Sequence, residues 1–181
     1  MGGRGTALLV IVVGVVGCGG GAPGPAAEPE ETLPMEEQAP ASPAATLPSV
    51  DVCALVPGTA VENLLGGTIS DEPHRSDSGE YQGCDYSLTP ADGGFEFVAI
   101  WIQPAATIRD PESVLETARG LGQEASAETL DGLGDRAFVV ENASEEQATV
   151  YVVRGETGVE VTAGTAERAR LLAEHVLEQA P

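Results

Sequence analysis

Residues 50–181 of this 181-residue chain predict an α+β domain, an antiparallel sheet of about five strands with three helices packed on it. Three observations predict this class. Several runs, such as residues 95–103, are rich in β-branched and aromatic residues and read as strands. Others, such as residues 165–179, repeat apolar residues at helical spacing. The links between the strands are short, so neighbouring strands are expected to pair antiparallel.

The first helix is expected to begin at Pro57, because proline suits the first position of a helix. An apolar face at positions 61, 64 and 65 supports it, and Gly66 and Gly67 end it. Residues 68–79 are polar and rich in turn formers, which predicts a loop.

Two strands follow, over residues 81–89 and 95–103, joined by a hairpin turn that contains the Asp-Gly signal at Asp92. In the second of these strands, two sets of apolar residues alternate: Phe97, Ala99 and Trp101 on one face, Val98, Ile100 and Ile102 on the other. Apolar residues on both faces predict a central strand covered on both sides, with Trp101 in the core.

A second helix is expected after Asp110 as cap and Pro111 as first residue, ending at Gly122. Its buried stripe is expected to contain Val114, Leu115, Ala118 and Leu121. A tight turn at residues 132–135 then leads into three antiparallel strands, 136–141, 148–154 and 159–162.

The last helix is expected over residues 165–179, with Thr165 as its N-cap. Its buried face is predicted to contain Ala169, Leu172, Ala173, Val176 and Leu177. The complete order is α-β-β-α-β-β-β-α.

The charge of the chain limits its partners. There are 29 acidic residues against 8 basic ones, all of them arginine, and the formal net charge is −21. Residues 50–181 have 24 acidic residues against 7 arginines, which gives −17. Such a surface repels phosphate backbones and anionic headgroups, so nucleic acid is not an expected partner.

The N-terminus reads as a secretory signal peptide over residues 1–17. Arg4 precedes an apolar run of about a dozen residues, which is too short to span a bilayer. The run ends in VVGC at residues 15–18, which resembles the lipobox of bacterial lipoproteins. The resemblance implies lipid attachment to Cys18, including palmitate, and cleavage before it. Two or more acyl chains anchor a protein stably, so the membrane is an expected partner through Cys18.

Residues 18–49 comprise the lipidated cysteine and a predicted disordered tether. The segment after Cys18 contains seven of the chain's 13 prolines, five acidic residues and no aromatic residue. A segment of this composition buries too little apolar surface to fold.

Two cysteines, Cys53 and Cys84, lie in the domain. In an exported protein an even pair predicts a disulfide, and only one pairing remains once Cys18 is lipidated. The two cysteines have no neighbouring histidine, so a zinc site is not expected.

No constellation of catalytic residues emerges from the sequence, and no enzyme activity and no cofactor are predicted. His74 and His175 lack metal-ligand spacing, and there is no Gly-x-Ser-x-Gly nucleophile turn. The acidic segment 70–80 offers weak calcium ligands, without the spacing of a known calcium loop. These are Asp71, Glu72, Asp77 and Glu80.

Several motifs in this order resemble small secreted lipoproteins of actinobacteria that carry a domain of unknown function. They are DVCALVP at 51–57, LLGG at 64–67, GCDY at 83–86 and GLGDRA at 132–137, followed by the last amphipathic helix. Tyr86 replaces the family's usual tryptophan, and Val56 replaces its usual serine or threonine, which removes a side-chain cap. The resemblance implies a location in the cell envelope, a disulfide and a non-catalytic module, and supplies no catalytic residues.

The sequence thus predicts an extracytoplasmic, lipid-anchored binding or accessory module. Its expected ligand is an envelope protein or a small apolar molecule, bound on the open face of the sheet or beside Trp101. The alternatives are a calcium-responsive envelope sensor and a hydrolytic enzyme. A pocket that combined an acidic residue with His74 would favour the enzyme.

Overall fold

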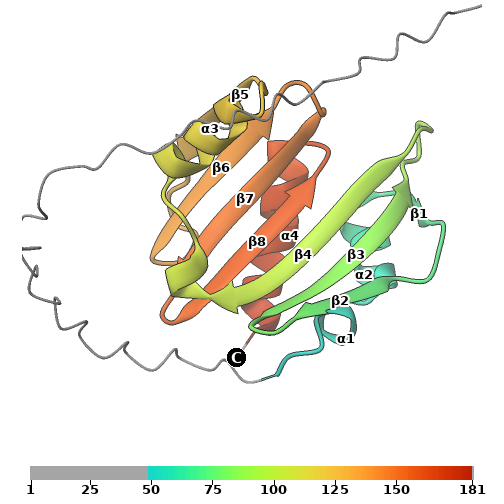
Figure 1. The fold of residues 1–181 in the computed structure, drawn as a ribbon. Helices are drawn as coiled ribbons and strands as arrows, with labels where there is room; N and C mark the ends of the chain where they lie inside the picture. Colours follow the sequence, from blue (N-terminus) through green and yellow to red (C-terminus); the bar gives the residue numbers. More distant parts are fainter. Residues whose placement is uncertain (1–48, 181) are drawn as a thin grey trace, which may run out of the picture. The chain divides into compact units, whose positions relative to one another are not determined.

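The computed structural model describes residues 49–180. The predicted signal peptide, Cys18 and the tether up to residue 48 lie outside the described residues. The described part contains four α-helices, a short 3-10 helix and eight strands (Figure 1). The helices are α1 (Val52–Leu55), α2 (Gly58–Leu65), α3 (Pro111–Gly120) and α4 (Ala166–Gln179), with the 3-10 helix η1 (Ala105–Thr107). The strands are β1 (Thr68–Ile69), β2 (His74–Ser78), β3 (Tyr81–Thr89), β4 (Glu96–Pro104), β5 (Ala125–Thr129), β6 (Arg136–Asn142), β7 (Gln147–Arg154) and β8 (Thr157–Ala163).

All eight strands form one antiparallel sheet in the order β1-β3-β4-β8-β7-β6-β5, and β2 pairs with β3 on the same edge as β1. The α+β class is confirmed, and all five predicted strands and three predicted helices are present. The count of strands was too low, because β1, β2 and β5 were missed, and so was the count of helices, because α1 was missed.

The expectation of a loop over residues 68–79 was wrong for Thr68–Ile69 and His74–Ser78, which form β1 and β2; residues 70–73 connect the two strands without regular structure. Strand β2 has the sequence HRSDS, and most of its residues are exposed. An edge strand whose two faces are both exposed to solvent needs no alternation of apolar and polar residues. Its sequence therefore resembles that of a loop. Backbone pairing with β3, from His74 opposite Asp85 to Ser78 opposite Tyr81, holds it in place.

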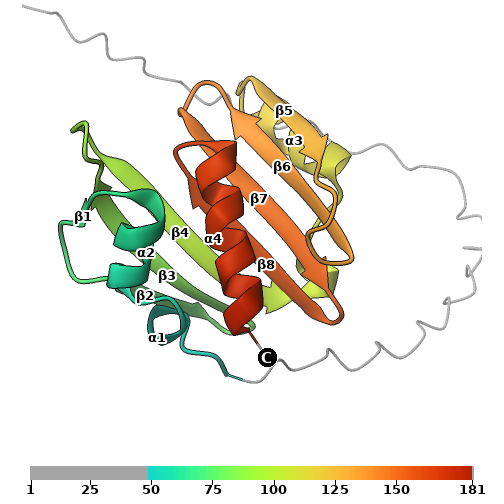
Figure 2. The same cartoon turned by 180° about the vertical axis from the view of Figure 1, so that it is seen from behind.

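The two faces of the sheet are covered differently. Helices α1, α2 and α4 lie on one face, and α3 lies on the other, over the β5–β6 end (Figures 1 and 2). The main core fills the first face. Its largest contributors from the sheet are Tyr86, Leu88, Val98, Ile100, Val150, Val152, Val159 and Val161, and α4 adds the predicted residues Ala169, Leu172, Ala173 and Val176.

A smaller apolar cluster lies beneath α3. Its buried members are Ile108, Phe138 and Val140, and Val114 and Leu115 of α3 pack against it. Asp110 caps α3 as predicted, since its carboxylate accepts a hydrogen bond from the Ser113 amide. The prediction that Leu121 belongs to the buried stripe was wrong: the helix ends before it, and the side chain is 72% exposed.

Strand β4 is central, but it is not covered on both sides as expected. Val98, Ile100 and Ile102 are buried in the main core. On the other side α3 lies over β5 and β6 instead of β4. Phe97 is therefore 39% exposed and Trp101 is only partly buried, and neither is a member of a core cluster. We call this side of β3, β4, β7 and β8 the open face.

The predicted disulfide is present between Cys53 and Cys84, with a Cα–Cα distance of 5.2 Å. It fastens α1 to β3. The phenol of Tyr86 strengthens this junction, because it donates a buried hydrogen bond of 2.6 Å to the Val56 carbonyl. Helix α2 begins one residue later than predicted, because Pro57 is its N-cap and not its first residue. Proline has no side-chain hydrogen-bonding group, so this helix has no side-chain cap.

An ion pair ties α4 to β4 and α2. The Arg168 guanidinium lies 2.7 Å from the Glu96 carboxylate, whose side chain is only 9% exposed. Arg168 also donates to the Leu65 carbonyl at the end of α2, over 2.8 Å. The Glu96 carboxylate accepts a second hydrogen bond, from the Gly164 amide. Thr165 then caps α4 as predicted.

Candidate functional site

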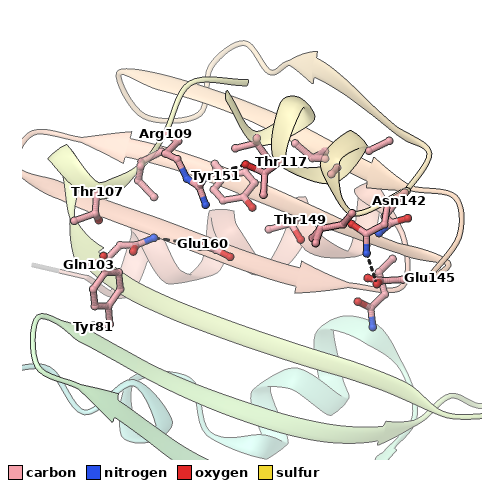
Figure 3. A pocket seen from close by; sticks show the side chains of 18 residues that line it. Tyr81, Gln103, Thr107, Arg109, Thr117, Asn142, Glu145, Thr149, Tyr151 and Glu160 are labelled. Carbon is pink, nitrogen blue, oxygen red and sulfur yellow. Dashed lines mark hydrogen bonds between the residues drawn. The ribbon is translucent and has the colours of Figure 1, made fainter. Parts of the chain in front are cut away.

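The open face is hollowed where the segment from η1 to α3 crosses it. We call this hollow the α3 groove; it has a volume of about 410 Å³ (Figure 3). This lies within the range of about 300–1,000 Å³ typical of small-molecule sites. Strands β4, β7 and β8 form its floor. Most of its polar lining residues are labelled in Figure 3: Tyr81, Gln103, Thr107, Arg109, Thr117, Asn142, Glu145, Thr149, Tyr151 and Glu160.

A polar pair lies on the floor of the α3 groove. The Gln103 amide donates a hydrogen bond of 3.2 Å to the Glu160 carboxylate. Gln103 is 4% exposed, and it is the one buried polar residue among those described. Burial raises the pKa of Glu160, while the Gln103 hydrogen bond and the charge of Arg109 act in the opposite direction. Glu160 is thus a carboxyl group that is costly to ionise in this place.

Tyr151 lies beside Glu160 on the same floor. Its ring stacks on Phe138, with centroids 4.8 Å apart, so the small cluster beneath α3 fixes its position. Burial raises the pKa of the Tyr151 phenol, and the nearby Glu160 carboxylate raises it further. The phenol therefore stays protonated at neutral pH and is available to donate or accept a hydrogen bond.

Arg109 forms part of the opposite wall. It is held at the start of α3 by a hydrogen bond of 3.1 Å from its guanidinium to the Thr117 hydroxyl. Figure 3 shows its side chain directed toward Tyr151 and Glu160. The α3 groove therefore places a fixed cation and a partly buried carboxyl group in the same hollow, together with neutral amides and hydroxyls.

The four acidic residues proposed as calcium ligands are not brought together. Asp77 forms an ion pair of 2.6 Å with Arg75 on β2. Asp71 and Glu72 are exposed before β2, and Glu80 lies in the turn after it. Within residues 49–180, no group of three or more His, Cys, Asp or Glu side chains is placed to hold a metal ion.

His74 does meet an acidic residue, but not in a pocket. On the edge of the sheet Ser76 donates a hydrogen bond of 2.8 Å to the Asp85 carboxylate, and the His74 ring lies 3.3 Å from the Ser76 hydroxyl. A serine nucleophile needs histidine between serine and aspartate. Here serine faces both of them, and the His74 side chain is 80% exposed. This arrangement lacks the relay of a hydrolase.

Sequence reasoning did not single out Gln103, Arg109, Tyr151 or Glu160. Glu160 alternates with Val159 and Val161, a pattern typical of an ordinary polar residue on the solvent-exposed face of a strand. Gln103 ends an apolar run and reads as the end of a strand. These positions form the floor of a hollow only because α3 packs over β5 and β6 and forms its wall.

Comparisons with protein-family models, with curated proteins and with solved structures gave no match. The resemblance to actinobacterial lipoproteins therefore stays a prediction. No helix within residues 49–180 is long and apolar enough to cross a membrane.

Proposed function

We propose that this chain is a lipid-anchored binding module of the bacterial cell envelope, and that the α3 groove binds a small molecule with both an amino and a carboxylate group. An amino acid or a short peptide has this chemistry. Glu160 would accept hydrogen bonds from the ammonium group, and Arg109 would pair with the carboxylate. The proposal replaces the small apolar ligand expected from the sequence, because the lining is rich in amides, hydroxyls and charged groups.

The observation that carries this proposal is the Gln103–Glu160 pair. Burying polar groups costs stability, and apolar residues of similar volume serve a fold better. A partly buried carboxyl group with a raised pKa, in a concave site, is a recognised indicator of a functional position. An incoming ammonium group would compensate the charge of Glu160, which supplies a reason for keeping it there.

The lining of the groove supports binding over catalysis. It includes no Ser, Cys or His side chain among the described residues, so two of the most frequent nucleophiles and the most frequent general base are missing from the hollow itself. The predicted absence of enzyme activity belongs to the same proposal.

The proposed location rests on the lipobox-like residues 15–18 and on the tether that follows. The Cys53–Cys84 disulfide is consistent with an oxidising, extracytoplasmic compartment. Lipid on Cys18 would anchor the module at the membrane.

The ligand is tested by calorimetry on the mature full-length protein in a neutral detergent. The probes are alanine dipeptides of both chiralities, each also in N-acetylated and C-amidated form. We expect acetylation and amidation each to weaken binding about 10-fold or more, the order of magnitude of a charge-assisted hydrogen bond.

Matched variants assign the two ends of the ligand. Arg109→Gln should bind the free and the amidated dipeptide equally, and Glu160→Gln should bind the free and the acetylated dipeptide equally. Arg170→Gln, which removes an exposed arginine on α4, serves as the control and should behave as the wild type. Binding of every probe by all variants with equal affinity would refute the α3 groove as the site.

The anchor is tested separately, by mass spectrometry and membrane fractionation in the native host. Cys18→Ala should abolish the added acyl mass and release the protein from membranes or leave it unprocessed. Normal processing with unchanged membrane retention would contradict the lipid anchor.

A further inference from the structure

A second surface on the open face lies beside the α3 groove. We call it the Trp101 platform; it consists of Phe97, Trp101, Tyr81 and the acidic residues Asp85 and Glu160. It adjoins the α3 groove, which Tyr81 and Glu160 also line. The strand registers place these side chains on one face: Trp101 is opposite Gly83 on one side and opposite Glu160 on the other, and Phe97 lies four residues before Trp101 on β4. Asp85 follows two residues after Gly83 on β3, on the same face. The inference below needs no ligand in the α3 groove.

The Trp101 ring lies flat on the sheet. A side chain at Gly83 would meet three adjacent atoms of the indole at nearly equal distances, Cε3 at 2.6 Å, Cδ2 at 2.7 Å and Cζ3 at 2.9 Å. Near-equal distances to adjacent ring atoms indicate that one face of the ring covers the glycine backbone. The opposite face of the ring is then directed away from the sheet, and α3 packs on β5 and β6 instead of on β4.

Two carboxylates, Asp85 and Glu160, neighbour Trp101 in the strand registers. The His74 ring lies 3.9 Å from Asp85, and the charge of Arg109 acts on Glu160 from the wall of the α3 groove. One oxygen of Asp85 accepts the Ser76 hydrogen bond, and the other, Oδ1, is buried and has no hydrogen-bond partner among the described residues. Among residues 49–180, Glu160 has the neutral Gln103 amide as its hydrogen-bond donor. None of the strands β3, β4 and β8 contains a lysine or an arginine.

We propose that the Trp101 platform is the docking site for a basic segment of a protein partner, with an arginine or lysine side chain lying on the indole between Asp85 and Glu160. A cation over a tryptophan face is attracted by the ring quadrupole, and the two carboxylates add direct charge pairing. The formal charge of −17 on residues 50–181 would guide a basic partner toward this domain. Aromatic side chains such as Phe97 and Tyr81 at the rim are typical of interfaces.

A neutral saccharide is the competing occupant of an exposed aromatic surface. It would stack on Trp101 equally well, but it carries no charge that could pair with the carboxylates of Asp85 and Glu160. Charge complementarity therefore favours the basic segment.

The test measures the anisotropy of a fluorescent hexa-arginine amide titrated with mature full-length protein at physiological salt. Trp101 is the only tryptophan of the chain, so its intrinsic fluorescence reports wild-type binding independently. We expect Trp101→Leu and Asp85→Asn each to weaken binding at least fivefold, and Trp101→Phe, which keeps an aromatic face, to weaken it less than Trp101→Leu. Thermal unfolding checks that each variant is folded, and Trp101→Phe preserves the cover over Gly83 should leucine fail to do so.

The controls separate a defined site from general attraction to an acidic domain. Asp131→Asn removes one exposed charge elsewhere, and Leu171→Ala removes an exposed apolar side chain on α4. Both should stay within twofold of the wild type. Equal affinity of the wild type, Trp101→Phe and Asp85→Asn would overturn the proposal. So would quenching of Trp101 by a neutral chito-oligosaccharide but not by the peptide. Failure of the dipeptide experiment above would leave this result unaffected.

Discussion

Reducing the Cys53–Cys84 disulfide should lower the stability of the domain by an amount that follows from its place in the chain. The two cysteines are 31 residues apart, so the bond closes a loop of about 32 residues in the unfolded chain. The chain-entropy relation gives about 3–4 kcal/mol for a loop of that length at 25 °C. A domain of this size has a free energy of unfolding of roughly 7–20 kcal/mol, so the reduced protein should still fold.

Urea unfolding with and without a reductant measures this difference on one and the same sequence. With a denaturant slope of about 2 kcal/mol per molar, the midpoint should fall by about 2 M. Alkylation gives the matching chemical readout, since neither cysteine of the domain should be labelled before reduction and both should be labelled after it in denaturant. The variant Cys53→Ala/Cys84→Ala should reproduce the reduced midpoint closely.

A shift equivalent to less than about 1 kcal/mol would refute the loop-closure reasoning, because the entropy lost by the unfolded chain does not depend on native contacts. A shift well above 5 kcal/mol would refute it from the other side. Such a shift would mean that the disulfide also stabilises the folded state, by keeping α1 and the contacts of Tyr86 in place, in addition to lowering the entropy of the unfolded chain.

Three further predictions concern single side chains. Burial raises the pKa of Glu160. Between the ordinary carboxyl pKa and this raised value, the folded state binds more protons than the unfolded state, so the free energy of unfolding falls as the pH rises through that window. Glu160→Gln should therefore raise the Tm at pH 7, and its advantage should shrink toward pH 4; a constant difference across pH would contradict the role of ionisation. Arg168→Met leaves the Glu96 carboxylate without its ion-pair partner and should lower the free energy of unfolding, measured in urea, by about 2 kcal/mol. The loss is smaller than for a fully buried ion pair because Arg168 is partly exposed. Adding Glu96→Gln should cost less than the sum of the single changes, and strict additivity would show that the two groups are not coupled. Gly134→Ala should cost more than Gly155→Ala, although both glycines have a positive φ, because only at Gly134 does a Cβ meet backbone, the Val153 carbonyl oxygen at 2.6 Å. The expected costs are about 2–3 kcal/mol and about 1 kcal/mol, and equal losses would refute the steric explanation.

Caps and periodicity made most of this fold predictable. Asp110 and Thr165 lie at N-caps, Gly66 and Gly122 lie at or just beyond helix ends, and each acts locally, so the sequence identifies it without the fold. The alternation of Val98, Ile100 and Ile102 with their neighbours likewise placed one face of β4 in the core. The elements missed, β1, β2, β5 and α1, are short and are held by partners remote in sequence.

The candidate site could not be predicted in the same way. Which half of the open face is covered depends on where α3 packs, and that is decided by the apolar cluster of Ile108, Phe138 and Val140. Trp101 illustrates the consequence. Its sequence context is that of a core residue, and it is left partly exposed only because α3 lies over β5 and β6.

Both margins of the sheet end in short strands that carry almost no apolar side chains, HRSDS in β2 and ASAET in β5. Free strand edges recruit other strands, and natural proteins discourage this with brief, charged or polar outer strands. The lipid anchor proposed above would confine the protein to two dimensions, where copies of it would collide often. Outer strands of this composition disfavour edge-to-edge pairing between copies, so the sheets should stay separate even at the high local concentration that the proposed anchor would produce.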